Sequence, residues 1–201
     1  MTDPAAELFG DHFPLVSRYV ELLATRGLEW GLIGPREVDR LWERHILNSV
    51  ALHELIPLGA SVADVGSGAG LPGIPLAVLR PDLQVTLIEP LLRRSTFLTQ
   101  AVDGLGITGR IRVMRSRAED HRETYDVVVS RALAPLPRLV AWCDPLREPR
   151  GLILALKGRS ANDEVRAAAR LLTEHHLSAT VLSVRAHLAA EPTTVIRLTA
   201  G

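Results

Sequence analysis

The sequence predicts an α/β fold, with a mostly parallel sheet covered by helices on both faces. From residue 61 onward, short apolar runs alternate with segments whose apolar residues recur at helical intervals. Two of these runs, 126–130 (DVVVS) and 151–156 (GLILAL), have the nearly continuous apolar character of strands buried on both faces. A chain of 201 residues can bury such a core without a disulfide or a metal.

Residues 1–57 are predicted to form a helical extension ahead of the sheet. Residues 4–24 carry apolar side chains at helical intervals, and residues 36–55 indicate a second helix, with Pro35 suited to its first turn. The break at Pro57-Leu58-Gly59 ends this pattern. We therefore expect two parts, the helical extension at 1–57 and one compact α/β unit at 58–201.

Seven strands are expected in the second part. They are predicted at residues 61–65, 84–88, 111–114, 126–130, 151–156, 179–185 and 195–198. Helices are predicted between several of them, at residues 74–79, 91–105 and 162–175. No predicted helix separates the last two strands, so we expect the last strand to run antiparallel in an otherwise parallel sheet.

The composition argues against a metal centre, a disulfide and a membrane span. Cys143 is the only cysteine, and the seven histidines show no metal-ligand spacing, so we expect no metal. No apolar run approaches the ~18 residues that a membrane span needs, and the acidic start lacks the basic and apolar regions of a signal peptide. These features favour a cytoplasmic protein that acts away from membranes, and we expect a monomer.

The charge is balanced overall but uneven along the chain. Twenty-three basic residues offset twenty-three acidic ones. Residues 1–60 hold five Arg and nine Asp or Glu, a net charge of −4, so the remainder carries +4. Such an asymmetry indicates either a charged partner or ordinary solvated surface charge, and both interpretations stay open at this point.

A glycine-rich turn between the first strand and the helix after it is the strongest indication of a site. It reads Asp64-Val65-Gly66-Ser67-Gly68-Ala69-Gly70-Leu71-Pro72-Gly73. Glycine lets the backbone turn sharply and lets a ligand approach closely, and the helix start adds unpaired N–H donors. A phosphate-binding P-loop is excluded, because no lysine precedes Lys157. A dinucleotide site is disfavoured, because Leu71 stands where its third glycine would be.

Two acidic residues at strand ends narrow the choice of ligand. Asp64, at the end of the first strand, would repel a pyrophosphate and favour a cationic ligand. Glu89, 25 residues further on at the end of the second strand, can accept both hydroxyls of a ribose, although a solvent-exposed glutamate is the plain alternative. S-adenosylmethionine fits both residues, because it carries a sulfonium and an adenosine but no phosphate. We therefore predict a cofactor site that includes Asp64, Gly66, Gly68, Gly70 and Glu89.

Five short motifs stand in a fixed order along the chain. They are 41–49 (LWERHILNS), 64–76 (DVGSGAGLPGIPL), 116–119 (SRAE), 130–132 (SRA) and 155–158 (ALKG). Together they resemble the RsmG (GidB) family of bacterial methyltransferases, which methylate N7 of a guanine in 16S ribosomal RNA. The resemblance covers nearly the whole chain.

The resemblance implies a class I S-adenosylmethionine-dependent methyltransferase with a Rossmann-like, seven-stranded sheet and a helical N-terminal extension. It also implies cofactor contacts at Gly66 and Leu71 in the turn, at Ala118 and Glu119 near the adenine, and at Arg131 after the fourth strand. The expected partner is 16S ribosomal RNA or a precursor of the small ribosomal subunit.

No catalytic residue is predicted, because N7 of guanine carries a free lone pair at neutral pH. The enzyme would act by aligning N7 with the methyl group and by excluding water. Basic side chains near strand ends are expected to contact the RNA. The candidates, each of which is otherwise a solvated surface charge, are Arg93, Arg94, Arg138, Lys157 and Arg159.

Three alternatives stay open from the sequence. His45 and Asn48, three residues apart, are candidates to line the mouth of the cofactor site. For His45 the alternative is a hydrogen-bonded histidine in the core. A nicotinamide-dependent oxidoreductase is opposed by Asp64 and Leu71. A binding module that keeps the cofactor fold without turnover is opposed by the intact glycine turn, by Glu89 and by Arg131.

Overall fold

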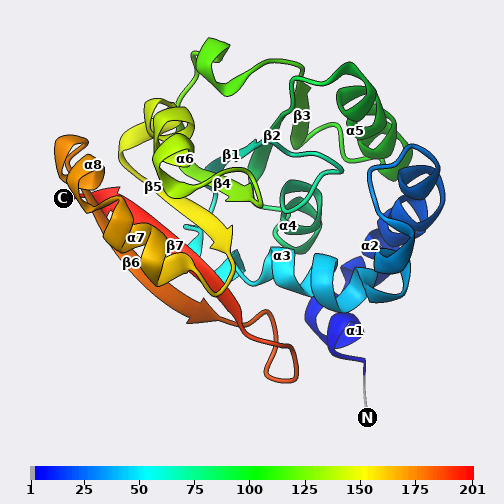
Figure 1. Cartoon of the computed structure of the whole chain (residues 1–201). Coiled ribbons are helices and arrows are strands. Elements are labelled where there is room, and N and C mark those ends of the chain that lie inside the picture. Colours follow the sequence, from blue (N-terminus) through cyan, green and yellow to red (C-terminus); the bar gives the residue numbers. More distant parts are fainter. Residues whose placement is uncertain (1–2) are drawn as a thin grey trace.

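A seven-stranded sheet with the order β3-β2-β1-β4-β5-β7-β6 forms the centre of the protein (Figure 1). The computed structural model describes residues 3–201, so residues 1 and 2 of the predicted extension lie outside the described residues. The strands are β1 (Ser61–Val65), β2 (Gln84–Ile88), β3 (Ile111–Met114), β4 (Tyr125–Arg131), β5 (Arg147–Lys157), β6 (Leu177–Val184) and β7 (Thr193–Ala200). Strands β1 to β5 pair in parallel, and β7 runs antiparallel to both β5 and β6. The predicted fold class is therefore confirmed.

The first three strands lie where the sequence predicts them, whereas β4, β5 and β7 are longer than predicted. β5 begins at Arg147 because its pairing with β4 continues past an irregularity between Tyr125 and Val127. β7 begins at Thr193 because it is hydrogen-bonded on both sides, to β5 and to β6. An apolar run in the sequence thus indicates the buried centre of a strand. The first and last residues of the strand depend on its pairing with the neighbouring strand.

Successive residues of the central strands face two separate cores, as the two-residue repeat of a strand requires. Val62 of β1 and Val127 of β4 belong to the core that includes the extension. Ala63, Val65 and Val128 belong to the core on the opposite face. The sheet is therefore buried on both sides, as its apolar strands predict.

Helices α4 (Gly73–Leu79) and α5 (Leu92–Leu105) cover one face together with the extension, and α6 (Leu136–Cys143), α7 (Ala161–Ala167) and α8 (Ala169–Glu174) cover the other (Figure 1). α6 is absent from the sequence prediction, because prolines surround the start of its short apolar stripe. The predicted helix at 162–175 is divided in two, because Ala168 leaves the helical conformation. Within residues 3–201, no helix is long and apolar enough to cross a membrane.

The extension is less regular than the two continuous helices that the sequence predicts. The first consists of α1 (Pro4–Phe9), the 3-10 turn η1 (Gly10–His12), α2 (Phe13–Leu22) and the π-helical η2 (Leu23–Gly27). The second consists of the 3-10 segments η3 (Pro35–Arg40) and η5 (His53–Leu55), with the π-helical η4 (Leu41–Leu47) and α3 (Asn48–Val50) between them. The prediction of regular helices was wrong here, because burial of an apolar stripe does not distinguish α from π windings. π-Helical turns often occur at functional sites, and η4 holds most of the 41–49 motif.

The extension and the sheet share one core. Phe9, Leu23 and Ile46 of the extension are buried in the same cluster as Val62 of β1 and Leu87 of β2. Removing the extension would therefore expose the part of this core that α4 and α5 do not cover. We propose that the extension (1–57) and the α/β unit (58–201) fold together as a single unit. The change of sequence pattern near residue 57 would then mark no boundary between independently folding domains.

Candidate active site

The glycine turn lies at the carboxyl edge of the sheet, where the strand order reverses. β1 stands in the middle, with β2 on one side and β4 on the other. The turn after β1 and the loop after β4 therefore leave neighbouring strands at the same edge. In parallel α/β sheets, ligands collect in the crevice at this point.

The buried carboxylate of Asp64, near the end of β1, holds the start of α4. Its Oδ2 atom accepts a hydrogen bond from the backbone N–H of Gly73 at 3.0 Å, and its carbonyl accepts one from the Ser67 hydroxyl at 2.7 Å. Its Oδ1 atom is buried and has no hydrogen-bond partner among residues 3–201. Burial raises the pKa of Asp64 to about 7, although the hydrogen bond from Gly73 to the carboxylate opposes this rise. A buried carboxylate oxygen without a partner is costly, and a positive charge close to the turn would reduce this cost.

Two side chains from other elements hold the turn in place. Glu89, just after β2, is buried, and its Oε2 and Oε1 atoms accept hydrogen bonds from the N–H groups of Gly68 and Leu91, each at 3.0 Å. From α2, the Tyr19 hydroxyl donates to the carbonyl of Ala69 at 2.7 Å. The conformation of the turn therefore depends on β2 and on the extension as well as on its own glycines.

Glycine is required at two positions of the turn. Gly66 has a φ of 72° and Gly70 a φ of 100°, in the left-handed region that other residues rarely adopt. A Cβ at Gly66 would collide with the side chain of Leu133, from the loop after β4, and a Cβ at Gly70 would collide with Ile74. The backbone at Gly66 is thus in direct contact with the neighbouring loop.

Two cavities open beside the turn. One, of about 260 Å³, is lined by Val65, Gly66, Ile88, Pro90, Leu91, Arg117, Ala118, Glu119, Leu133 and Trp142. The other, of about 230 Å³, is lined by Leu32, Ile33, His45, Gly66, Ser67, Gly68, Ala69, Leu71, Arg94, Arg131 and Ala132. Gly66 lines both cavities, so the two cavities adjoin at this residue, beside the Leu133 side chain.

A hydrogen-bonded chain from the extension orients Arg131 at the end of β4. The Arg131 guanidinium donates to His45 Nδ1 at 2.6 Å, and to the His45 carbonyl and the Ser49 hydroxyl, each at 3.1 Å. On the other side of the ring, His45 Nε2 lies 2.8 Å from Glu37 Oε2. Because a guanidinium only donates, the tautomer that satisfies both contacts carries its proton on Nε2 and donates it to Glu37. Burial lowers the pKa of His45, and although Glu37 opposes this, the nearby Arg131 lowers it further.

The sequence-predicted cofactor residues gather around these two cavities. The residues that line a cavity are Gly66, Gly68, Leu71, Ala118, Glu119 and Arg131. Asp64 lies beneath the turn, and Gly70 lies within the turn but lines neither cavity. Glu89 is 2% exposed and lines neither cavity, because its carboxylate faces backbone N–H groups. The exposed-glutamate alternative is therefore wrong, and the ribose contact of Glu89 stays a prediction.

Both interpretations of His45 hold at once. The residue is nearly buried and fully hydrogen-bonded, as a core histidine would be, and it also lines the cavity beside Leu71. Asn48 lines a different and larger cavity, and its amide donates to the Thr193 hydroxyl at 2.8 Å.

Four of the five sequence-predicted RNA contacts are exposed arginines. Arg93 and Arg94 begin α5, Arg138 lies on α6, and Arg159 follows β5. The Arg138 guanidinium lies 5.7 Å from the centre of the Trp142 ring, in a cation–π arrangement. These side chains all follow the carboxyl ends of strands and can reach a partner at this edge.

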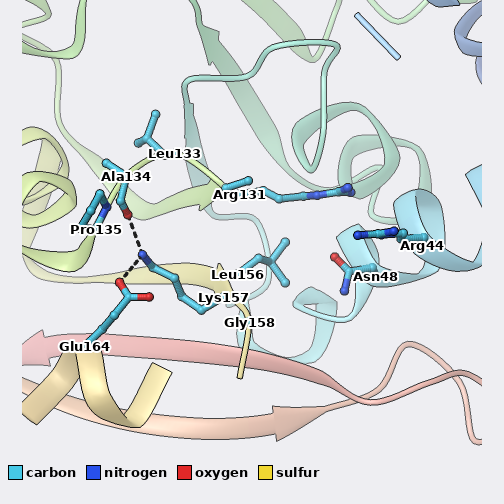
Figure 2. A pocket seen from close by; sticks show the side chains of 11 residues that line it. Arg44, Asn48, Arg131, Leu133, Ala134, Pro135, Leu156, Lys157, Gly158 and Glu164 are labelled. Atoms are coloured by element: carbon cyan, nitrogen blue, oxygen red, sulfur yellow. Dashed lines mark hydrogen bonds and ion pairs between the residues drawn. The ribbon is translucent and has the colours of Figure 1, made fainter. Parts of the chain in front are cut away.

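Lys157 differs from the four arginines. Its ammonium donates to the Ala134 carbonyl and to Glu164 Oε2, each at 2.6 Å, and its side chain is 10% exposed (Figure 2). An ammonium with these two partners is part of a cavity wall. The structure therefore disfavours the direct phosphate contact that the sequence predicts for Lys157.

Several residues of the site are missing from the sequence prediction. Tyr19 bonds to the turn, and Leu133 packs on Gly66. Trp142 lines a cavity, and Glu37 bonds to His45. No local spacing connects them with the glycine motif. Tyr19 follows Val16 on the buried stripe of a predicted helix, which indicates burial but not a hydrogen bond to the turn.

Replacing Asp64 with Asn should change the pH dependence of stability. Because folding raises the pKa of Asp64 from 3.8 to about 7, the native state binds more protons than the unfolded chain between these values. The wild-type free energy of unfolding, relative to that of the variant, should fall by about 1.4 kcal/mol for each pH unit between about pH 5 and pH 7, then level off.

Urea denaturation of both proteins at a series of pH values measures this difference. Asp126→Asn is the matched control, because hydrogen bonds from Ser61 lower the pKa of Asp126 and keep it ionised throughout this range. Its stability difference from wild type should stay constant. Parallel pH curves for wild type and Asp64→Asn would show that Asp64 does not titrate as its burial requires.

Comparisons with known proteins identify the family. The model of the GidB family, rRNA small subunit methyltransferase G, matches residues 13–191. Ribosomal RNA small subunit methyltransferase G of Thermobifida fusca is 51% identical over 201 residues, covering 98% of this chain and 84% of that protein. The protein of the same name from Mycolicibacterium gilvum is 55% identical over 175 residues, covering 85% of this chain and 76% of that protein.

Solved structures share the fold at low sequence identity. A ribosomal protein L11 methylase from Lactobacillus delbrueckii subsp. bulgaricus has a TM-score of 0.59 and 18% identity, covering 75% of each chain. P. horikoshii TYW2 in complex with MeSAdo has a TM-score of 0.62 and 14% identity, covering 83% of this chain and 63% of that one. The family match and the relatives confirm the resemblance found in the motifs, and the chain belongs to the GidB family of small-subunit ribosomal RNA methyltransferases.

Proposed function

We propose that this protein transfers a methyl group from S-adenosylmethionine to N7 of a guanine in 16S ribosomal RNA. The observation that carries the proposal is the glycine turn over the buried Oδ1 atom of Asp64, at the point where the strand order reverses. Membership of the GidB family supports the RNA substrate, because the relatives are named small-subunit ribosomal RNA methyltransferases.

The residues around the turn fit this cofactor. The cavity beside Ala118 and Glu119 has a largely apolar wall, including Trp142, that suits an adenine ring. The cavity beside Leu71 and Arg131 would receive the methionine part. The P. horikoshii TYW2 structure, which shares the fold, contains MeSAdo. The buried acid beneath the turn favours a positively charged ligand over a pyrophosphate.

Glu89 and Arg131 would bind the polar parts of the cofactor. Each Glu89 oxygen accepts one backbone N–H and retains a second lone pair for a ribose hydroxyl. Three hydrogen bonds from Arg131 go to His45 and Ser49, and its other N–H groups can bind the carboxylate of the methionine. Arg131 would thereby hold the methionine end against the extension.

The chain has to position the guanine rather than remove a proton from it. S-adenosylmethionine supplies an electrophilic methyl group, and N7 of guanine supplies the electron pair that accepts it. Alignment of the reacting atoms within about 3–3.5 Å accounts for much of the rate that such a site can provide. The loop after β4, with Ala132 and Leu133, lines the cavities at the turn and would exclude water from the reacting atoms.

The RNA partner would meet the carboxyl edge of the sheet. We propose that the exposed arginines Arg93, Arg94, Arg138 and Arg159 contact its phosphates. The substrate would be 16S ribosomal RNA or a precursor of the small ribosomal subunit. We further propose that the protein acts as a monomer in the cytoplasm.

Methyl transfer to N7 can be tested directly. The purified protein is incubated with S-adenosylmethionine and small-subunit ribosomal RNA, or small subunits, from cells that lack this gene. Nucleoside mass spectrometry should detect new N7-methylguanosine, in equal amount to the S-adenosylhomocysteine released. Methylation at another atom, or release of neither product, would contradict the proposed reaction.

Gly66→Asp should weaken the binding of S-adenosylmethionine by roughly 100-fold, as expected for strong overpacking. The new side chain would occupy the crossing between the two cavities, displace Leu133 and strain a residue with a φ of 72°. Isothermal calorimetry measures the affinity. Gly109→Asp is the matched control, because Gly109 is exposed and a Cβ there would meet nothing within 4 Å. If Gly66→Asp and wild type bind S-adenosylmethionine with equal affinity, the turn is not part of the cofactor site.

Replacing Arg93 and Arg94 together with Ala should weaken RNA binding and reduce its salt dependence. Each phosphate contact that is lost should reduce the slope of log affinity against log salt by about 0.7–0.9. The control is the double replacement of Arg150, exposed near the start of β5 at the opposite edge, and Arg170, whose side chain is 92% exposed on α8. If the slope of the Arg93 and Arg94 variant equals that of wild type, these residues do not contact the RNA.

A further inference from the structure

A third cavity, of about 610 Å³, adjoins the two at the turn and has no role in the site described so far. It shares Arg131 and Ala132 with the cavity beside Leu71, and Leu133 with the other. Its walls come from η4, α3, the loop after β4, the end of β5 and α7. The residues are Arg44, Asn48, Arg131, Ala132, Leu133, Ala134, Pro135, Leu156, Lys157, Gly158 and Glu164 (Figure 2). Its volume is in the range of pockets that hold small organic ligands.

The two sides of this cavity differ in charge, because one holds an ion pair and the other holds two arginines and an amide. Figure 2 shows Glu164 and Lys157 together on one side, and Arg44, Asn48 and Arg131 on the other. The side with Arg131 adjoins the glycine turn, where the methyl group would be delivered. A ligand in the cavity therefore has one end near the turn and the other near the carboxylate of Glu164.

Glu164 is held in place as an ionised acceptor. Its Oε2 atom accepts from Lys157 Nζ at 2.6 Å and from the Leu136 N–H at 3.0 Å, and its Oε1 atom accepts from the Ser160 hydroxyl at 3.2 Å. Burial opposes ionisation, but the hydrogen bond and charge of Lys157, together with the bonds from Leu136 and Ser160, outweigh it and hold the pKa of Glu164 below its ordinary value. The ammonium is itself fixed by the Ala134 carbonyl at 2.6 Å. At neutral pH this carboxylate can therefore only accept hydrogen bonds.

A fixed acceptor of this kind distinguishes guanine from the other RNA bases. Guanine presents two adjacent donors, N1–H and the N2 amino group, on one edge, and its N7 atom lies on the far side of the ring system. Adenine presents an acceptor at N1, which a carboxylate would repel. Uracil presents a single N–H between two carbonyl oxygens, and cytosine an acceptor beside its amino group. With N1–H and N2–H₂ at Glu164, N7 points toward the side of the cavity that adjoins the turn.

Oε2 of Glu164 already accepts two hydrogen bonds, whereas Oε1 accepts one and keeps a free lone pair. We propose that Oε1 of Glu164, held by Lys157, accepts from the N2 amino group of the target guanine and faces its N1–H, and that Glu164 is the residue that selects guanine in this cavity. The inference rests on the proposed function, because it places the base whose N7 is methylated. It also gives Lys157 a role other than a phosphate contact, since the ammonium orients Glu164.

Inosine at the target nucleotide tests the contact. Inosine keeps N7, O6 and N1–H but lacks the N2 amino group. Once the methylated nucleotide is known, two small-subunit RNAs are prepared by ligation, one with guanosine and one with inosine at that position. Wild type should methylate the inosine RNA with a kcat/KM about 10- to 100-fold lower, the effect of losing one hydrogen bond to a charged group.

Glu164→Gln should remove this discrimination. Because Lys157 needs an acceptor, the Gln oxygen should turn toward the ammonium and leave the amide NH₂ facing the donors of the base. We expect kcat/KM for the guanosine RNA to fall by about 10- to 100-fold and the ratio between the two RNAs to approach about one. S-adenosylmethionine affinity and melting temperature should stay near their wild-type values.

Asp163→Asn is the matched control, on the same helix and with an exposed side chain paired with Arg166. It should keep both the activity and the discrimination of wild type. Equal methylation of the two RNAs by wild type, or an unchanged ratio in Glu164→Gln, would overturn the assignment of Glu164. Absence of methyl transfer from wild type to any RNA would instead overturn the proposed function, so the two failures are distinguishable.

Discussion

The buried carboxylate of Asp64 is the constraint on which the rest of the site depends. A carboxylate at the end of a central strand needs a donor, and the N–H of Gly73 at the start of α4 provides it. That bond requires close approach, because a Cβ at Gly73 would lie 2.8 Å from Asp64 Oδ2. The chain between Gly66 and Gly73 must therefore reverse tightly, and the left-handed conformations at Gly66 and Gly70 make the reversal possible. The same reversal leaves the backbone of Gly66 open to two cavities.

The predictable part of the fold is the part governed by local burial. Strands such as 61–65 and 84–88 are apolar because both of their faces are covered, and that requirement is visible in the chain itself. Features that depend on a neighbour were missed or misplaced. The start of β5 depends on its pairing with Tyr125, and the π-helical winding of η4 depends on packing that brings His45 toward Arg131. An apolar stripe alone is compatible with either winding.

The candidate site also has a part that the sequence predicts and a part that depends on distant contacts. Asp64 and the glycines were predictable because a tight turn over a strand end leaves a continuous motif. The contacts that complete the site join residues far apart in the chain, such as Tyr19 with Ala69 and Arg131 with His45. Glu89 was predicted at the correct strand end, but its burial against backbone N–H groups follows from the turn folding back onto β2. The sequence therefore predicted the strand end or turn at which each site residue lies, but it did not predict the hydrogen-bond partner of each side chain.

The acidic extension acts within the site as well as on the surface. Glu37 accepts from His45 and lies 3.3 Å from the partly exposed Arg44, so part of the negative charge of residues 1–60 orients the neutral His45 ring and pairs with one arginine. His45 can orient Arg131 only while its ring is neutral, because a proton on Nδ1 would face the guanidinium donors. Burial lowers the pKa of His45 and so preserves the neutral ring at neutral pH. Any change that moves η4 therefore moves Arg131, and the geometry of the extension and the electrostatics of the site cannot vary independently.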